Sequence, residues 1–224
     1  MTATDRTTRK IVYVIDDNVD VRKSLHFALE AAGITVWPFA GPEDFLDALA
    51  TLSPAPILLD VRMPRIDGVQ LLQIIREREI NWPVIMMTAH GEIPVAVAAM
   101  KLGAADFLEK PFDLDALEDL LDTAFSRLDA LVAEAQRLKE ARSRLASLSP
   151  RELDVAKRLA LGETSKMVAL NLGISHRTVE IHRAAVATKL GAKSTAGVVR
   201  LMVEAGEGGE IPSDPPAQPA AGFG

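Results

Sequence analysis

The sequence of 224 residues contains no cysteine. Disulfide bonds, thiol chemistry and cysteine-based zinc sites are therefore excluded. No apolar run approaches the roughly 18 residues that a membrane-spanning helix needs, and the polar segment 1–10 lacks the apolar core of a secretory signal. Internal repeats, a phosphate-binding loop and a Ser-His-Asp set are also absent. These absences predict a cytoplasmic chain that has no membrane partner and is not an enzyme.

Charge is distributed unevenly along the chain, whose formal net charge is −6. Residues 1–125 contain 11 Lys and Arg against 20 Asp and Glu, a net of −9. Residues 147–205 contain 9 against 5, a net of +4. An acidic half followed by a basic segment indicates two domains with different functions. Because the whole chain is acidic, any affinity for DNA has to come from a small, focused surface.

The first half alternates short apolar segments with amphipathic ones. The apolar segments are predicted to be buried strands, at 11–15, 34–39, 57–59, 84–87 and 105–108. The other segments have helical periodicity, at 21–32, 42–49, 68–78, 94–102 and from 114 onward. Strict alternation of this kind is typical of a parallel sheet that is covered on both faces. We therefore predict a doubly wound α/β domain with five parallel strands, of the flavodoxin-like kind.

A long helix is predicted to leave this domain, because apolar residues continue at steps of three and four from Leu117 to Leu145. Arg142 interrupts the last of these repeats. Two interpretations stay open. The stripe is either one face of a single helix that packs on its own domains, or the seam of a dimeric coiled coil that alanine and arginine weaken.

The residue pattern of the second half predicts helices throughout. Ser149, Pro150 and Glu152 have the spacing of a capping box with proline at the first helical position, so a helix is expected to begin there and to end at Gly162. Three further helices are expected, at 164–172, 176–190 and 195–205. The predicted organisation is a disordered N-terminus (1–9), an α/β domain (10–125), a helical linker (126–146), a four-helix domain (147–205) and a disordered tail rich in Gly, Pro and Ala (206–224).

Polar residues follow four of the predicted strands. They are Asp16 and Asp17, then Asp60, Thr88 and Lys110. Because the carboxyl ends of parallel strands share one edge of a sheet, these side chains are expected to lie together. Crowded carboxylates repel one another, and a hard cation such as Mg²⁺ removes that repulsion. Asp60 could then attack phosphorus as a nucleophile, while Mg²⁺, Lys110 and Thr88 stabilise the phosphoryl oxygens.

Each of these residues has an ordinary explanation when it is taken alone. An Asp after a strand is usually a helix cap or a solvated turn, a Lys-Pro pair is usually a turn, and a Thr at a strand end usually has no special role. Their coincidence at four strand ends is what favours a phosphoryl-transfer site.

This half closely resembles the response-regulator receiver family. The segments that carry the resemblance are VIDDN (14–18), LLDVRMPRIDG (58–68), MMTAHG (86–91) and ADFLEKPF (105–112). The resemblance implies that Asp60 is the phosphoacceptor for a histidine kinase. It also implies a Mg²⁺ ion whose ligands come from Asp16 (through water), Asp17, Asp60 and the backbone carbonyl of Arg62.

The resemblance assigns two further features. Thr88 and Phe107 match the family's switch pair, and the peptide bond before Pro111 is expected to be cis. The chain departs from the family pattern at two positions: Phe107 has no tyrosine hydroxyl, and Asn18 stands where an acidic residue is common. Neither departure removes a member of the phosphorylation set.

The helices expected at 164–172 and 176–190, with a glycine-containing turn between them, have the pattern of a helix-turn-helix. The second helix is predicted to enter the major groove with its N-terminal half toward the bases. The predicted DNA-binding residues are Lys166, Ser175, His176, Arg177, Thr178, Glu180, Arg183 and Lys189, with Ala184 also exposed and with Val179, Val186 and Leu190 in the core.

The predicted DNA-binding residues have different expected roles. Lys166, Arg177 and Lys189 are expected to contact phosphates, although a solvated surface position explains any one basic residue equally well. Arg183 is expected to project into the groove near the middle of the helix. The Glu180 carboxylate would repel phosphate, but it can accept a hydrogen bond from cytosine N4.

This region resembles the LuxR/NarL-type helix-turn-helix through LSPRELDVAKRLALGETSKMVALNLGISHRTVEIHRAAVATKLGAKS (148–194). Ser165 replaces the usual asparagine before the lysine, and Ala185 stands where asparagine is frequent. The whole chain is similar to transcriptional regulators of the FixJ subfamily. That similarity implies a two-component regulator in which phosphate on Asp60 promotes receiver dimerisation and operator binding. The implied partners are a cognate histidine kinase, double-stranded DNA, a second copy when phosphorylated, and RNA polymerase.

Two other functions compete with this interpretation. One is a phosphate relay or receiver-type enzyme whose second domain only binds protein, which the intact helix-turn-helix and its positive charge disfavour. The other is a constitutive DNA-binding protein that is never phosphorylated, which the complete set of Asp, Thr and Lys residues disfavours.

Overall fold

The computed structural model describes residues 10–88 and 93–207, and the chain divides after Val132 into two compact units. The ends that were predicted to be disordered, 1–9 and most of 206–224, lie outside the described residues.

The first unit is built on a parallel sheet whose described strands have the order β2-β1-β3-β4-β5. Its strands are β1 (Ile11–Ile15), β2 (Thr35–Phe39), β3 (Ile57–Asp60), β4 (Val84–Thr88) and β5 (Asp106–Glu109). All the pairings are parallel, so the carboxyl ends of the strands gather at one edge. The chain order reverses between β1 and β3, and in open α/β sheets this reversal point is where ligands bind.

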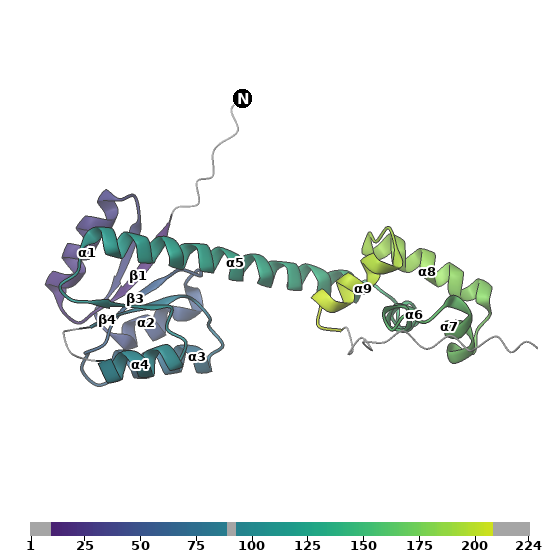
Figure 1. Ribbon diagram of the computed structural model, residues 1–224, viewed down its shortest axis with the longest axis horizontal. Coiled ribbons are helices and arrows are strands. Elements are labelled where there is room, and N and C mark those ends of the chain that lie inside the picture. The colour runs from purple at the N-terminus through teal and green to yellow at the C-terminus, as the bar shows by residue number, and fades with distance from the viewer. Residues whose placement is uncertain (1–9, 89–92, 208–224) are drawn as a thin grey trace, which may run out of the picture. The chain divides into compact units, whose positions relative to one another are not determined.

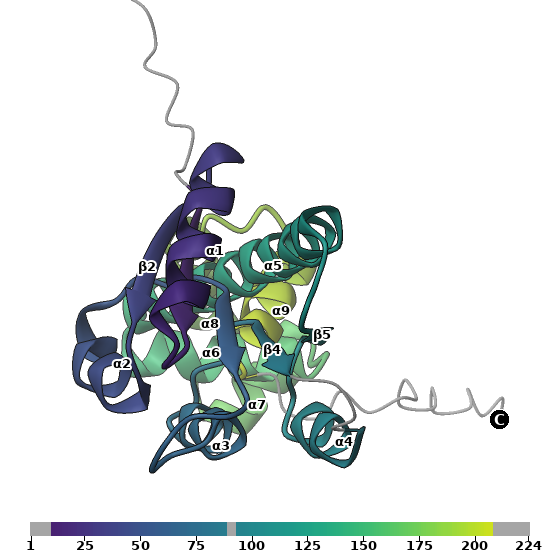
Figure 2. The ribbon, with the colours of Figure 1, turned by 90° about the vertical axis from the view of Figure 1, so that its left-hand side faces the viewer.

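Helices cover both faces of this sheet (Figure 1). The helices are α1 (Val19–Ala31), α2 (Pro42–Ala48), α3 (Gly68–Glu77), α4 (Ile93–Lys101) and α5 (Leu114–Ala146), and a short 3-10 helix (Leu49–Thr51) follows α2. Figure 2 shows α3 and α4 on the side of the sheet opposite α5. Because side chains alternate along a strand, Val12 and Val14 pack with α1 and α5, whereas Tyr13 and Ile15 pack with α2 and α3.

The predicted doubly wound domain is therefore confirmed, with shifts at the ends of elements. Helix α1 begins at Val19 and not at the predicted residue 21, because the Asn18 side chain accepts a hydrogen bond from the Asp20 amide at 2.9 Å and caps the helix. The prediction missed this turn because Val19 is exposed and adds nothing to the buried stripe.

The second unit contains α6 (Pro150–Ala160), α7 (Ser165–Leu172), α8 (His176–Leu190) and α9 (Thr195–Glu204), together with the end of α5. The predicted capping box at Ser149 is present. Gly173 and Gly191 end α7 and α8 with positive φ values of 63° and 64°, a conformation that favours glycine. The predicted four-helix domain is confirmed.

Helix α5 belongs to the core of each unit at its two ends. Leu117 and Leu121 are buried against the sheet of the first unit, and Ala141 and Leu145 are buried in the second. Both ends therefore pack as the single-helix interpretation expected. Ala135, in the middle of the stripe, is exposed, and the coiled-coil interpretation stays a prediction. Within the described part of the chain, no helix combines the length and the apolar character needed to cross a membrane.

Candidate functional site

Three carboxylates meet at the carboxyl edge of the sheet. Asp16 follows β1, Asp60 ends β3, and these two strands are neighbours. One ligand oxygen from each of Asp16, Asp17 and Asp60 lies within 4.8 Å of the other two. Asp16 and Asp60 are buried, at 1% and 7% exposure, whereas Asp17 is exposed. The predicted gathering of these residues is confirmed.

Lys110 joins the two buried carboxylates. Its Nζ atom lies 2.7 Å from Asp16 Oδ2 and 2.5 Å from Asp60 Oδ1. Burial raises the pKa of Asp60, and the hydrogen bond and charge of Lys110 act against this rise. Burial lowers the pKa of Lys110, but its hydrogen bonds to Asp16 and Asp60 outweigh burial and leave the pKa raised. The peptide bond before Pro111 is cis, as expected.

The backbone around Asp60 leaves no room for a larger residue at position 68. Gly68 begins α3, and its amide donates to the Val61 carbonyl at 2.9 Å. A Cβ atom at Gly68 would lie 2.1 Å from the Asp60 carbonyl oxygen. This close approach explains the glycine that ends the 58–68 motif. The Arg62 amide also donates to Asp60 Oδ2, at 3.1 Å.

One residue beside this site, Arg22, was not predicted from the sequence. Arg22 of α1 donates from Nη1 to the Asp16 backbone carbonyl at 2.5 Å, while the Asn18 amide donates to Asp16 Oδ1 at 2.8 Å. Both bonds hold the acidic turn after β1. Helical periodicity could not have found Arg22, because a residue's place on a helix does not say which loop faces it.

The oxygen-rich cluster suits a hard divalent cation. The carboxylates of Asp16, Asp17 and Asp60 with the Lys110 ammonium carry a formal charge of −2. A divalent ion would neutralise that charge. Carboxylate oxygens are ligands of the class that Mg²⁺ and Ca²⁺ prefer.

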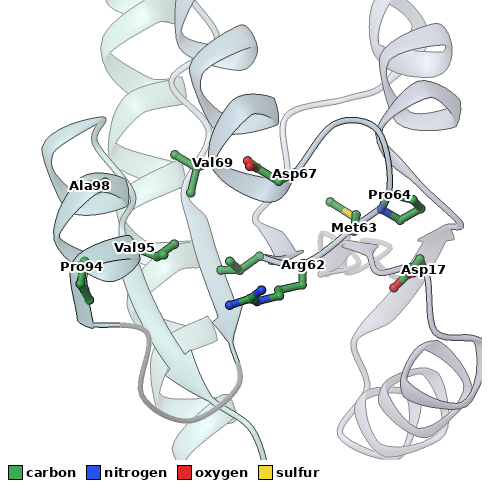
Figure 3. A pocket seen from close by; sticks show the side chains of 10 residues that line it. Asp17, Arg62, Met63, Pro64, Asp67, Val69, Pro94, Val95 and Ala98 are labelled. Atoms are coloured by element: carbon green, nitrogen blue, oxygen red, sulfur yellow. The ribbon is translucent and has the colours of Figure 1, made fainter.

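A groove of about 770 Å³ opens beside the acidic cluster (Figure 3). Asp17 lies on one side of it, and Val69 of α3 and Val95 of α4 lie on the other. Arg62 lies between them. The acidic cluster can therefore be approached from outside the unit.

The predicted switch pair lies on adjacent strands. Thr88, at the end of β4, is 1% exposed, and it lies opposite Glu109 of β5. Phe107 lies opposite Met86 and is half-buried against the core on the α3 and α4 side. Residues 89–91 of the predicted motif lie outside the described residues.

Helix α8 of the second unit has the predicted division into faces. Val179, Val186 and Leu190 are buried, as expected. The residues expected on the surface that are indeed exposed are His176, Arg177, Glu180, Ala184 and Lys189, and Lys166 is exposed on α7. Ser175 caps the helix by accepting from the Thr178 amide at 3.1 Å, and the two hydroxyls lie 2.8 Å apart. Both predicted DNA-binding hydroxyls thus also serve the start of the helix.

Arg183 differs from the expectation. It is half-buried, and its guanidinium donates to the Ser165 hydroxyl, to Glu180 Oε1 at 3.1 Å and to Thr195 Oγ1 at 3.4 Å. Arg183 is therefore less exposed than expected, while its projection into the DNA groove stays a prediction. The reason is tertiary: the first residues of α7 and α9 present hydroxyls to the middle of α8.

Lys189 also has a partner inside the unit. Its Nζ atom lies 2.6 Å from Oε2 of the buried Glu152. Hydrogen bonds from Lys189 and from the Ser149 backbone lower the pKa of Glu152 to about 2. This ion pair competes with the phosphate contact that was predicted for Lys189. Sequence reasoning had identified Glu152 only as part of a capping box.

Two family descriptions match the chain. Residues 12–122 match "Response regulator receiver domain", and residues 146–202 match "Bacterial regulatory proteins, luxR family".

Known proteins are also similar in sequence to most of this chain. The transcriptional regulatory protein FixJ of Bradyrhizobium diazoefficiens is 43% identical over 89% of this chain and 98% of its own length. The transcriptional regulatory protein TdiR of Thauera aromatica is 36% identical over 99% of this chain and 100% of its own length. Among solved structures, the response regulator StyR has a TM-score of 0.78 at 32% identity, covering 88% of this chain and 99% of that chain. Full-length FixJ from B. japonicum has a TM-score of 0.56 at 43% identity, covering 89% and 98%.

Proposed function

Because the chain belongs to the FixJ-type two-component response regulators, which are transcriptional regulators with a receiver domain and a LuxR-type DNA-binding domain, we propose that phosphorylation of Asp60 activates its binding to DNA. The observation that carries this proposal is the Lys110 ammonium held between two buried carboxylates, Asp16 and Asp60, beside the exposed Asp17. The proposed boundaries remain 10–125 for the receiver, 126–146 for the linker and 147–205 for the DNA-binding domain.

The proposed reaction is transfer of a phosphoryl group from a histidine kinase. An oxygen of Asp60 forms a bond to phosphorus while the bond between phosphorus and the kinase imidazole breaks, and the imidazole nitrogen keeps the electron pair. Lys110 stabilises the negative charge on the phosphoryl oxygens, and the Thr88 hydroxyl donates to one of them. Asp17, Asp60 and the Arg62 carbonyl, with Asp16 through water, would hold a Mg²⁺ ion, which would supply further positive charge at the same oxygens.

The phosphate then biases a two-state equilibrium. Thr88 moves toward the phosphate, and Phe107 fills the space beside it. This changes the surface of α4 and β5, where Ile93, Val97 and Met100 are exposed at 75%, 50% and 49%. Exposed apolar side chains on one helix support the use of this surface in a homodimer.

A dimer presents two copies of α8 to paired operator half-sites about one helical turn apart. Lys166 and Arg177 contact phosphates, and the exposed polar side chains of α8 face the bases. The protein acts in the cytoplasm, where its kinase partner, DNA and RNA polymerase are available to it.

The proposal is tested by treating the chain with a small phosphodonor and Mg²⁺, and by measuring bound phosphate, molar mass and DNA affinity together. The wild type should gain one phosphate, become dimeric and bind its operator more tightly, and Asp60→Asn should do none of these. If Asp60→Asn is labelled as well as the wild type, the acceptor assignment is wrong. A phosphorylated protein that stays monomeric yet binds DNA more tightly would exclude the dimer mechanism in favour of release from autoinhibition.

A further inference from the structure

Three side chains from two helices are linked at the middle of α8. Arg183 donates to the Ser165 hydroxyl and to Glu180 Oε1, the latter at 3.1 Å. The pKa of Glu180 is lowered by the nearby Ser165 hydroxyl and by Arg183. Each group has a role that its chemistry allows, because a hydroxyl can donate and accept while a guanidinium only donates.

The three members of this network differ in exposure. Ser165 is buried at 7% exposure, and the Arg183 side chain is 35% exposed. The Glu180 side chain is 48% exposed, on the surface of α8 that is proposed to face DNA. The half-buried Arg183 therefore holds an exposed carboxylate, and its guanidinium also donates to the Thr195 hydroxyl oxygen at 3.4 Å.

An exposed carboxylate on a DNA-facing helix is unfavourable unless it binds a donor, because phosphates repel it. A carboxylate has about four lone-pair sites, so the hydrogen bond from Arg183 leaves room for another donor. In the major groove, cytosine presents only its N4 amino group, whereas adenine presents an N7 acceptor beside its N6 amino group. A carboxylate is repelled by that N7 acceptor and is not repelled by cytosine.

The space beside the carboxylate is also suitable. Ala184 lies one turn after Glu180 and is exposed. Glu180, Arg183 and Ala184 line a hollow of about 270 Å³ that extends to Thr195. The small side chain at position 184 leaves the carboxylate accessible from solvent.

We propose that Arg183, itself held by Ser165, keeps the Glu180 carboxylate in one orientation so that it reads a cytosine in the operator. Arg183 is then a positioning residue that acts through Glu180 and not a contact to phosphate or guanine. This inference rests on the proposed DNA-binding function and adds the class of base that the site selects.

The test begins by selecting bound sequences from random double-stranded DNA with the phosphorylated, full-length wild type. The affinity for the selected operator is then compared with its affinity for operators in which each C:G pair is replaced in turn. At one position in each half-site, replacing cytosine should weaken wild-type binding about tenfold, a typical value for one base contact. For Glu180→Ala and Arg183→Ala this ratio should fall to about one, and the double variant should show no further change.

Two other variants separate positioning from a general loss of binding. Arg177→Ala, which removes an exposed arginine from the first turn of the same helix, should weaken binding and keep the cytosine preference. Ser165→Ala, which keeps nearly the same volume, should reduce the preference without changing thermal unfolding by more than a few degrees. If Arg183→Ala does not fold, the cytosine preference of Ser165→Ala alone tests the inference.

The result that overturns the inference is an Arg183→Ala variant that folds, binds every operator more weakly and still prefers cytosine at that position. Loss of a guanine preference in Arg183→Ala, with the cytosine preference intact, would also overturn it by making Arg183 a direct reader. If the wild type selects no sequence at all, the proposed function itself fails, and that result is distinct from either of these.

Discussion

The two units assemble their candidate sites from residues at very different separations in the sequence. In the first unit Lys110 binds Asp16 and Asp60, from which it is separated by 94 and 50 positions. In the second, Glu180 and Arg183 are three positions apart on one helix, and Ser165 is 18 positions from Arg183. The first site therefore forms only when the sheet forms, whereas the DNA-facing surface is largely a property of α8.

The two units also differ in whether the carboxylates of their candidate sites are buried or exposed. The first buries Asp16 and Asp60 at the end of the sheet and balances them with one lysine and, we propose, a cation. The second keeps Glu180 exposed and holds it with the half-buried Arg183. A buried site can concentrate charge for a reaction, while an exposed site has to keep its shape without burial.

Removing a carboxylate from the acidic cluster of the first unit should have the largest effect. Asp17→Ala is expected to abolish Mg²⁺-dependent phosphorylation, because it removes one of three clustered ligands while the exposed position leaves the fold intact. Incorporation of phosphate from a small donor over a Mg²⁺ titration measures this. The matched control is Asp67→Asn, which keeps a capping side chain at α3 and should retain labelling. Normal labelling of Asp17→Ala in metal-free buffer would reject the cation site.

Removing the lysine of the same site should have the second largest effect. Lys110→Met should slow phosphorylation about a hundredfold, since loss of one preorganised donor to the reacting oxygens typically costs that much. Single-turnover labelling at saturating phosphodonor measures the rate. Lys101→Met, which removes an exposed lysine from the last turn of α4, should leave the rate unchanged. Equal rates for the two variants would show that Lys110 only balances charge in the resting protein.

The close approach of the Gly68 and Asp60 backbones should make any substitution of Gly68 destabilising. Gly68→Ala is expected to lower its free energy of unfolding by about 1–3 kcal/mol, because the added Cβ atom meets backbone that cannot rotate away. Denaturant unfolding followed by tryptophan fluorescence reports on this unit, which contains Trp37 and Trp82. At Gly41 a Cβ atom would be 3.5 Å from a flexible glutamate side chain, so Gly41→Ala should change little. Equal stability of both variants would mean that α3 shifts freely.

The ion pair between Glu152 and Lys189 in the second unit should produce a pH dependence of stability. The pKa of Glu152 falls from 4.5 to about 2 on folding, so its ion pair stabilises the unit fully above pH 4.5 and loses this contribution as the pH falls toward 2. Thermal unfolding of the wild type, followed by circular dichroism, should therefore lose stability steeply across this range. Glu152→Gln and Lys189→Met should both flatten the dependence. A Lys189→Met profile as steep as that of the wild type would assign the effect to other carboxylates.

The smallest effect is expected for a single phosphate contact. Lys166→Ala should weaken binding to operator and random DNA alike and reduce the slope of log affinity against log salt by about one. Fluorescence anisotropy over a salt series measures both quantities. Lys139→Ala, an exposed lysine on α5, should leave the slope unchanged. An unchanged slope for Lys166→Ala would place Lys166 away from the phosphates.

Much of this arrangement could be predicted from residue patterns. The strands, most helices, the capping box at Ser149 and the gathering of Asp16, Asp17 and Asp60 were predicted correctly, because parallel strands always bring their carboxyl ends to one edge. The start of α1 was placed two residues late, since the Asn18 cap leaves no trace in apolar periodicity. Local chemistry and repeating geometry are what a sequence can reveal.

Side-chain partners across elements were decided only by the tertiary structure. The pattern of α8 distinguished its buried residues from its exposed ones, yet it could not show that Ser165 and Thr195 would take up Arg183. It likewise could not show that Lys189 would bind Glu152, or that Arg22 would hold the carbonyl of Asp16. The spacing of apolar residues within a single helix is enough to show which face of that helix is buried. The partner of a long, charged side chain depends on where a second element lies, and only packing determines that position.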